Sequence, residues 1–143
     1  MDDVSPQQMK EIFAWAKTIA VVGASRDPAK AAHRIPRYMY EQGYQVLPVS
    51  PHPGEMFGQP VRPSLAEVPG PIDVVDVFRP PAEAASVARQ AVECGATVLW
   101  FQLGTETGEA VRIAADADLT VVTGHCLMVA HAALANGTGG STA

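Results

Sequence analysis

The chain has 143 residues, of which 48% are hydrophobic and 17% are charged, and its formal net charge is −5. This length suits one domain with a buried core, and the composition excludes a disordered chain. The negative charge argues against non-specific binding to nucleic acid or to an anionic membrane, which needs a broad basic face, but a few local donors still suffice to bind a small anion.

The sequence carries no signal for export, membrane insertion or metal binding by cysteine. Its first residues are acidic and lack a basic-plus-apolar signal sequence, and no apolar run approaches the roughly 20 residues that span a bilayer. Cys94 and Cys126 define neither a disulfide framework nor a metal-ligand spacing. We therefore expect a cytoplasmic protein with one domain over residues 1–136 and a flexible, glycine-rich tail over 137–143.

Short apolar runs predict β-strands that are covered on both faces. Each run is rich in Val, Ile or aromatic residues and is nearly continuous rather than alternating, as in a parallel sheet. The predicted strands cover residues 18–22, 45–49, 73–78, 97–101 and 119–122.

Helical patterns with recognisable ends lie before, between and after these runs. Ser5 and Gln8 form a capping box that begins the first helix, and Gly43 is a C-terminal cap of the second. Another capping box predicts a short helix at 64–67. The first helix ends at Trp15, and the second covers residues 31–42. Further helices are predicted over 80–94, over 107–116 and after Cys126.

This alternation of strands and helices predicts right-handed crossovers and a doubly wound α/β fold. The expected architecture is a mainly parallel five-stranded sheet with helices on both faces. Ligands of such sheets bind at the carboxyl ends of the strands, near the point where the strand order reverses. The loops after the strands are therefore the places to look for function.

The loop Gly23-Ala24-Ser25-Arg26 follows the first strand, a few residues before a helix begins. Gly23 allows close approach of a ligand, Ser25 offers a hydroxyl, and the helix start offers free N–H groups and the positive end of its dipole. The Arg26 guanidinium could bond two phosphate oxygens. The combination suits a pyrophosphate, and a simple tight turn is the alternative. Lys30 and Arg37, further on, are interpreted as a solvated helix face.

Two familiar nucleotide motifs are absent. The dinucleotide fingerprint needs three glycines, and only Gly23 is present. The second strand ends at Ser50-Pro51, without the acidic residue that holds an NAD ribose, and no Lys-Ser/Thr pair of a P-loop is found. These absences disfavour NAD binding of the usual kind and P-loop hydrolysis.

The later strand ends add further candidates. Phe78 either belongs to the core or packs on a base or a pantetheine arm. Arg79 either pairs with an acid or meets an anion, and we favour the anion. Gln102 is a polar residue at the predicted mouth of the site and is a candidate ligand contact.

No catalytic set is evident. Cys126 lies where a strand meets a helix, a position that can lower a thiol pKa, but a buried, inert side chain is the favoured interpretation. His131 is expected near the mouth or on the helix surface, without an acid–base partner. His33 and His52 are scattered and give no metal spacing with the cysteines.

Segments 19–25, 38–51, 72–79, 99–104 and 125–128 resemble, in the same order, the stand-alone CoA-binding domain proteins. These are similar to the amino-terminal nucleotide-binding domain of the succinyl-CoA synthetase α subunit, and the resemblance covers nearly all of residues 8–135. Ser50 stands where this family commonly has Asn.

The resemblance implies a Rossmann-like fold that binds coenzyme A. The phosphates would lie at residues 23–26 and the adenosine near Ser50-Pro51. The remaining contacts would come from Phe78, Arg79, Pro80 and Gln102. The phosphohistidine of the synthetase belongs to another domain, so ligase chemistry is not expected here.

Three hypotheses follow. The leading one is a protein that binds coenzyme A or an acyl-CoA without catalysis of its own. A protein partner is allowed by this hypothesis but is not identified. The second is an enzyme that acts on a CoA thioester through Cys126 or His131. The third is a regulatory module for NADP or another nucleotide, because Arg26 could meet a 2′-phosphate as readily as the 3′-phosphate of CoA. No nucleic-acid or membrane partner is expected.

Overall fold

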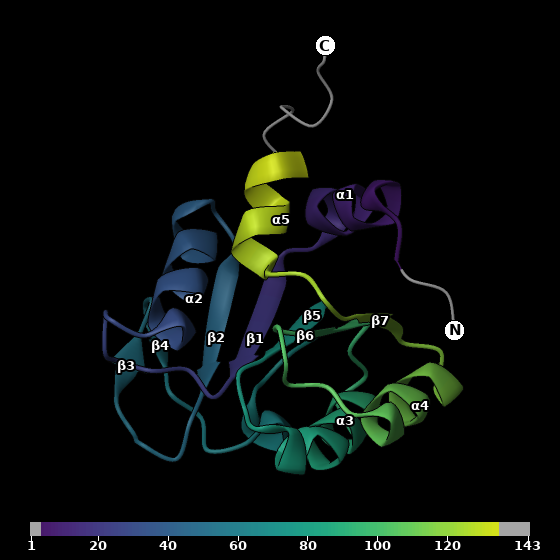
Figure 1. The fold of residues 1–143 in the computed structure, drawn as a ribbon. Coiled ribbons are helices and arrows are strands. Elements are labelled where there is room, and N and C mark those ends of the chain that lie inside the picture. The colour runs from purple at the N-terminus through teal and green to yellow at the C-terminus, as the bar shows by residue number, and fades with distance from the viewer. Residues whose placement is uncertain (1–3, 135–143) are drawn as a thin grey trace.

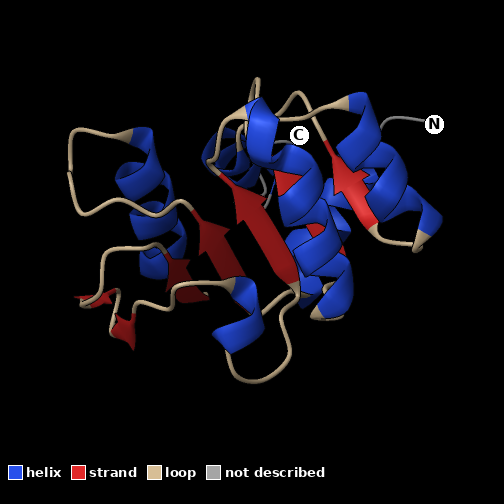
Figure 2. Ribbon diagram, turned by 90° about the horizontal axis from the view of Figure 1, so that it is seen from below, coloured by secondary structure: helices blue, strands red, loops and turns tan. Residues whose placement is uncertain are grey.

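The computed structural model describes residues 4–134, so the predicted tail at 137–143 lies outside the described residues. A five-stranded sheet with the order β2-β1-β5-β6-β7 forms its centre, and every neighbouring pair is parallel (Figures 1 and 2). The strands are β1 (Thr18–Val22), β2 (Gln45–Val49), β5 (Val74–Val77), β6 (Val98–Phe101) and β7 (Thr120–Val122). The doubly wound α/β fold predicted from the sequence is confirmed.

Helices cover both faces of the sheet (Figure 1). One layer holds α1 (Pro6–Trp15), α2 (Ala31–Glu41) and α5 (Leu127–Leu134), and the opposite layer holds α3 (Ala84–Glu93) and α4 (Gly108–Asp116). No helix within residues 4–134 is long and apolar enough to cross a membrane.

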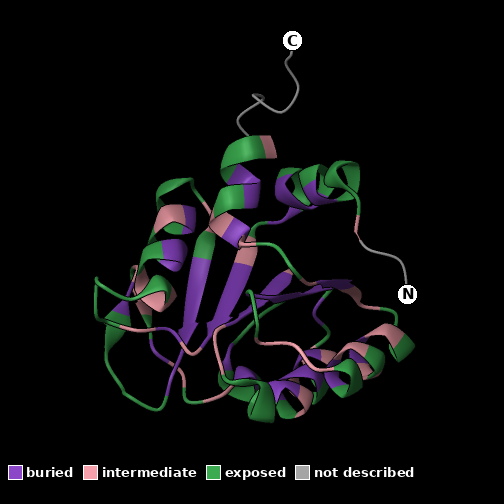
Figure 3. Ribbon diagram, viewed as in Figure 1, coloured by how far each residue is buried: buried purple, intermediate pink, exposed green. Residues whose placement is uncertain are grey.

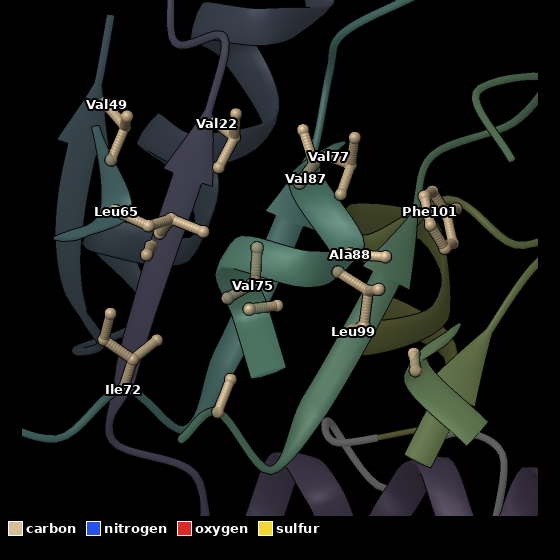
Figure 4. Close-up of a cluster of buried hydrophobic side chains, with 14 of the residues drawn as sticks. Val22, Val49, Leu65, Ile72, Val75, Val77, Val87, Ala88, Leu99 and Phe101 are labelled. Atoms are coloured by element: carbon tan, nitrogen blue, oxygen red, sulfur yellow. The ribbon is translucent and has the colours of Figure 1, made fainter. Parts of the chain in front are cut away.

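Strand side chains alternate between two apolar cores, which is why the strands read as continuous apolar runs. Val75 and Leu99 face the α3–α4 layer, where Ala88 of α3 packs on them (Figure 4). Val74 and Val98 face the layer of α1, α2 and α5. The strands are accordingly buried along most of their length (Figure 3).

One of the two predicted capping boxes forms. At the start of α1, the Ser5 Oγ accepts from the Gln8 N–H at 3.1 Å, and the Gln8 Oε1 accepts from the Ser5 N–H at 2.8 Å. The capping box predicted at 64–67 is wrong: the segment is a 3₁₀ turn, η1 (Leu65–Glu67), without a side-chain cap. The Glu67 N–H, which would donate to the Ser64 hydroxyl in a capping box, instead donates to the Ser64 carbonyl at 3.1 Å.

Two short elements differ from the sequence prediction. The helix expected from residue 80 begins as a 3₁₀ turn, η2 (Pro81–Glu83), before α3. A small antiparallel hairpin, β3 (Glu55–Met56) and β4 (Gln59–Pro60), was not expected in the Pro-rich stretch after β2.

The strand order reverses between β1 and β5. The chain leaves β1 toward α2 on one face and leaves β5 toward α3 on the other, so the loops after these strands diverge at the carboxyl edge. A crevice is expected at such a point.

Candidate functional site

A pocket of about 400 Å³ lies at this reversal, and we call it the switch-point pocket. The loops after β1, β2 and β5 contribute to it. The predicted site residues that line it are Gly23, Ala24, Ser25, Arg26, Ser50, Pro51, Phe78 and Arg79. The structure thus brings together residues from three strand ends that are far apart in the sequence.

Gly23 is required by the close packing of two strand ends. Its φ is +94°, and a Cβ there would lie 2.8 Å from Arg79 Cδ and 3.1 Å from the Phe78 carbonyl oxygen. The N–H groups of Gly23 and Ala24 both donate to the Val49 carbonyl, at 2.9 and 3.3 Å. The loop is therefore fixed against β2 on one side and against the end of β5 on the other.

Ser25 is held by α2. Its N–H donates to the Ala32 carbonyl at 3.2 Å, a carbonyl that would otherwise accept from residue 36 of the helix. Pro36 has no N–H, so this acceptor is free. The Ser25 Oγ accepts from the Asp27 N–H at 3.1 Å, and the His33 Nδ1 lies 2.7 Å from the Ser25 carbonyl oxygen.

Free backbone donors lie at the start of α2. The N-cap residue Lys30 makes no side-chain cap, and within the described residues the N–H groups of Ala31 and Ala32 have no partner. Lys30 and Ala32 line the switch-point pocket. Free amides, a helix dipole and an ammonium group together suit phosphate oxygens. The interpretation of Lys30 as part of a solvated helix face missed this position.

Arg26 lies in the pocket wall, but its guanidinium is used within the protein. Its Nη2 donates to the His52 carbonyl at 3.0 Å and to the Pro53 carbonyl, and a Cβ at Gly54 would overlap the guanidinium. The Arg26 side chain therefore connects the loop that follows β1 to the loop that follows β2.

Arg79 also has an internal partner. Its Nε and Nη2 donate to the two carboxylate oxygens of Glu83, at 3.0 and 2.7 Å, and this hydrogen-bonded pairing lowers the pKa of Glu83. From the sequence we favoured an anion over an acidic side chain as the partner of Arg79. The structure instead pairs Arg79 with an acidic side chain four residues further along the chain. Arg79 still lines the switch-point pocket.

The hydroxyl groups of Ser50 and Ser25 form the same kind of hydrogen bond. The Ser50 Oγ accepts from the His52 N–H at 3.1 Å, two residues on, just as the Ser25 Oγ accepts from Asp27. Asn at position 50 could form the same kind of turn. His52, which follows Ser50-Pro51 directly and was not predicted as a contact, also lines the pocket.

Two predicted contacts, Gln102 and Pro80, do not line this pocket. Gln102 is buried, and its Oε1 accepts from the Leu127 N–H at 3.1 Å, so it caps the start of α5. Pro80 is an exposed residue that precedes η2.

Cys126 and His131 do not form a pair. Cys126 lines an apolar groove between α1 and α5, whereas His131 lines a different pocket. The His131 ring is buried, its Nδ1 is 2.9 Å from the Tyr38 hydroxyl, and burial lowers its pKa. The expected place of His131, at the mouth or on the helix surface, is wrong because α5 turns this residue toward Phe13 and Tyr38.

A buried carboxyl group in β5 was not singled out from the sequence. Asp76 is completely buried between Val21 and Trp100 of the neighbouring strands, and neither of its oxygens has a hydrogen-bond partner within residues 4–134. Burial raises its pKa well above the ordinary value. No group of three or more His, Cys, Asp or Glu residues in the described part of the chain is placed to hold a metal ion.

A family model described as a CoA binding domain matches residues 17–132. YneT, an uncharacterized protein of Bacillus subtilis (strain 168), is 38% identical over 132 residues, which cover 92% of this chain and 98% of that protein. The α subunit of an ADP-forming acetate–CoA ligase II from Pyrococcus furiosus is 33% identical over 88 residues, which cover 61% of this chain and 19% of that subunit. The structure of cell-free ID.343 from Thermus thermophilus has a TM-score of 0.88 at 39% identity, covering 91% of this chain and 98% of that one.

The family match, the parallel sheet and the motifs at the strand ends agree with one another, and the match spans most of the described residues. The chain belongs to the CoA-binding domain family.

Proposed function

We propose that this protein binds coenzyme A or an acyl-CoA in the switch-point pocket, at the carboxyl edge of the sheet, without catalysis of its own. The observation that carries the proposal is the start of α2, where the N–H groups of Ala31 and Ala32 have no partner in the described residues, and where Lys30 and Ala32 line a pocket of about 400 Å³. The pyrophosphate would bind there, and the adenosine would extend past Ser50 and Pro51.

The charge of the pocket supports an anionic ligand in spite of the net charge of −5. Lys30, Arg26 and Arg79 line it, with Arg79 paired to Glu83, and Asp27 is the acidic residue among its lining side chains. A local excess of positive charge attracts phosphate independently of the global balance.

The competing hypotheses need features that lie elsewhere. An enzyme acting on the thioester would use Cys126 or His131, and these line two other pockets. NAD would need an acidic residue where Ser50 stands. NADP and CoA differ in the position of their extra phosphate, so a direct comparison of ligands separates them.

Isothermal titration calorimetry with CoA, dephospho-CoA, NADP and NAD tests the proposal. We expect CoA to bind most tightly and, at a hundred times its Kd, to stabilise the protein by about 2.7 kcal/mol in a thermal-shift assay. Lys30→Ala should weaken binding roughly tenfold or more, since hydrogen bonds to charged groups contribute about 1.5–3 kcal/mol.

Arg89→Ala is the matched control. Arg89 also carries an exposed positive charge, but it pairs with Glu109 at 3.4 Å and does not line the switch-point pocket. Its CoA affinity should equal that of the wild type. The proposal fails if folded protein gives neither heat nor a thermal shift with millimolar CoA, or if NADP binds more tightly than CoA.

A further inference from the structure

Helix α5 presents apolar side chains to solvent as well as to the core (Figure 3). Its exposed residues, Val129, Ala132 and Ala133, are all aliphatic, and Val129 is 59% exposed. No charged residue occurs from Leu119 to Leu134. Because a helix that is apolar on all sides is normally covered on all sides, the exposed side of α5 is a candidate for contact with another molecule.

A groove of about 240 Å³ runs beside this exposed side, where α1 and α5 pack together (Figure 1). Pro6 and Met9 line it from α1, and Val129 and Leu134 line it from α5. His125 is the polar side chain among its lining residues. We call this site the α1–α5 groove. The same patch thus carries an exposed side chain, Val129, and a hollow next to it.

The charge of this face suits a second copy of the chain. The protein carries a net charge of −5, so contact between two copies is favoured where the surface is neutral. α5 has no charged residue, and α1 has one of each sign, Lys10 and Glu11, both exposed. Across a two-fold axis, Lys10 can pair with Glu11 of the partner subunit.

Other occupants fit the groove less well. Residues 1–3 would bring two carboxylates into it, and residues 135–143 consist of Ala, Asn, Gly, Thr and Ser, without a large apolar side chain. A lipid surface attracts helices with a basic polar face, which α5 lacks. A two-fold contact instead needs one patch that carries both a projection and a matching hollow, and Val129 beside the groove provides both.

We propose that two copies of this chain associate through their α1–α5 grooves, with the Val129 side chain of each subunit in the groove of the other. The inference does not depend on the proposed function, because the groove and the switch-point pocket share no lining residue. A stable interface takes about 20–30 residues from each partner, whereas α1 and α5 have 10 and 8 residues. The dimer should therefore be weak, with a Kd on the order of 100 μM.

Analytical ultracentrifugation of the full chain, from about 10 μM to about 1 mM, tests the proposal. Sodium sulfate should raise the dimer fraction because it strengthens apolar contacts, whereas a charge-driven contact would weaken as salt is added. Val129→Glu should raise the Kd at least about tenfold, because the contact would bury an unpaired carboxylate. Glu is a better helix former than Val, so this variant should stay folded, as circular dichroism can check.

Leu103→Glu is the matched control. Leu103 is also an exposed aliphatic residue, at 63% against 59% for Val129, and it does not line the α1–α5 groove. Its Kd should equal that of the wild type. A wild-type protein that stays monomeric at about 1 mM, a dimer that sulfate dissociates, or equal Kd values for Val129→Glu and the wild type would each overturn the inference.

The occupant of the groove can be identified by NMR on a sample that mixes isotope-labelled and unlabelled subunits. Nuclear Overhauser effects between subunits should connect the Val129 methyl groups to the partner subunit's Met9. Contacts from Val129 to residues 1–3 or 135–143 of the same chain would instead show that the chain covers its own groove, and the inference would fail.

Discussion

Replacing Gly23 with alanine tests the packing of the switch-point pocket. The added methyl carbon would lie 2.8 Å from Arg79 Cδ and 3.1 Å from the Phe78 carbonyl oxygen. The side chain of Arg79 can move away, whereas the backbone of Phe78 is held by its N–H, which donates to the Val22 carbonyl at 2.8 Å. The φ of +94° adds strain that is independent of these contacts.

The expected cost has two parts. A left-handed backbone costs about 1–2 kcal/mol for a residue with a Cβ, and overpacking adds about 1–3 kcal/mol. Gly23→Ala should therefore lower the free energy of unfolding by about 2–5 kcal/mol. It should also weaken CoA binding, because the methyl group displaces Arg79 from the pocket wall.

Gly43→Ala isolates the backbone part. Gly43 has a φ of +100°, and no heavy atom of its surroundings lies within 4 Å of a Cβ built there. Urea unfolding followed by circular dichroism should give a loss of only about 1–2 kcal/mol for this variant. The double variant Gly23→Ala/Arg79→Ala should recover part of the difference. Equal losses in Gly23→Ala and Gly43→Ala would refute the packing argument.

The remaining predictions concern pH and charge. Burial raises the pKa of Asp76, so the folded protein holds this proton to a higher pH than the unfolded chain, which loses it near the ordinary pKa of 3.8. Above pH 3.8, stability should therefore fall as the pH rises, by up to about 1.4 kcal/mol per pH unit. Urea unfolding between pH 4 and 8 should show a weaker decline for Asp76→Asn; parallel curves would contradict this. Burial lowers the pKa of His131 below 6.5, so the unfolded chain takes up a proton that the folded state resists, and stability should fall as the pH drops below 6.5. An NMR titration that gives the His131 imidazole a pKa of 6.5 or higher would contradict that assignment. Glu83→Gln frees the Arg79 guanidinium, and because an exposed ion pair is worth at most about 1 kcal/mol, CoA affinity measured by calorimetry should rise by no more than about fivefold. Weaker binding would mean that Glu83 instead orients Arg79 toward the ligand.

The sheet was predictable because its strands are buried on both faces. A strand covered on both faces is apolar at every position, and the run at 18–22 matches β1 to the residue. The same logic predicted that residues 23–26, 50–51 and 78–79 meet at one edge of the parallel sheet, where they line the switch-point pocket. The strands β5 and β6 are shorter than the predicted segments 73–78 and 97–101, whose end residues belong to the adjoining loops.

The partners of polar side chains were not predictable from the sequence. Gln102 and Arg79 both follow strands, yet one caps α5 and the other pairs with Glu83, and the difference depends on how the chain enters the next helix. The hairpin around Phe57 escaped notice for another reason. Its strands have two residues each, too few to show a period, and an aromatic residue is not expected at such a turn.

A proline inside α2 affects which amides beside the switch-point pocket are already hydrogen-bonded. Pro36 cannot donate to the Ala32 carbonyl, and that carbonyl instead accepts the Ser25 N–H. The Ser25 N–H is thereby bonded and the loop is held against the helix, whereas the N–H groups of Ala31 and Ala32 have no partner in the described residues, and Ala32 lines the pocket. A residue that weakens a helix by itself therefore helps to preorganise the proposed phosphate site, because the acceptor it leaves free fixes the loop beside the remaining donors.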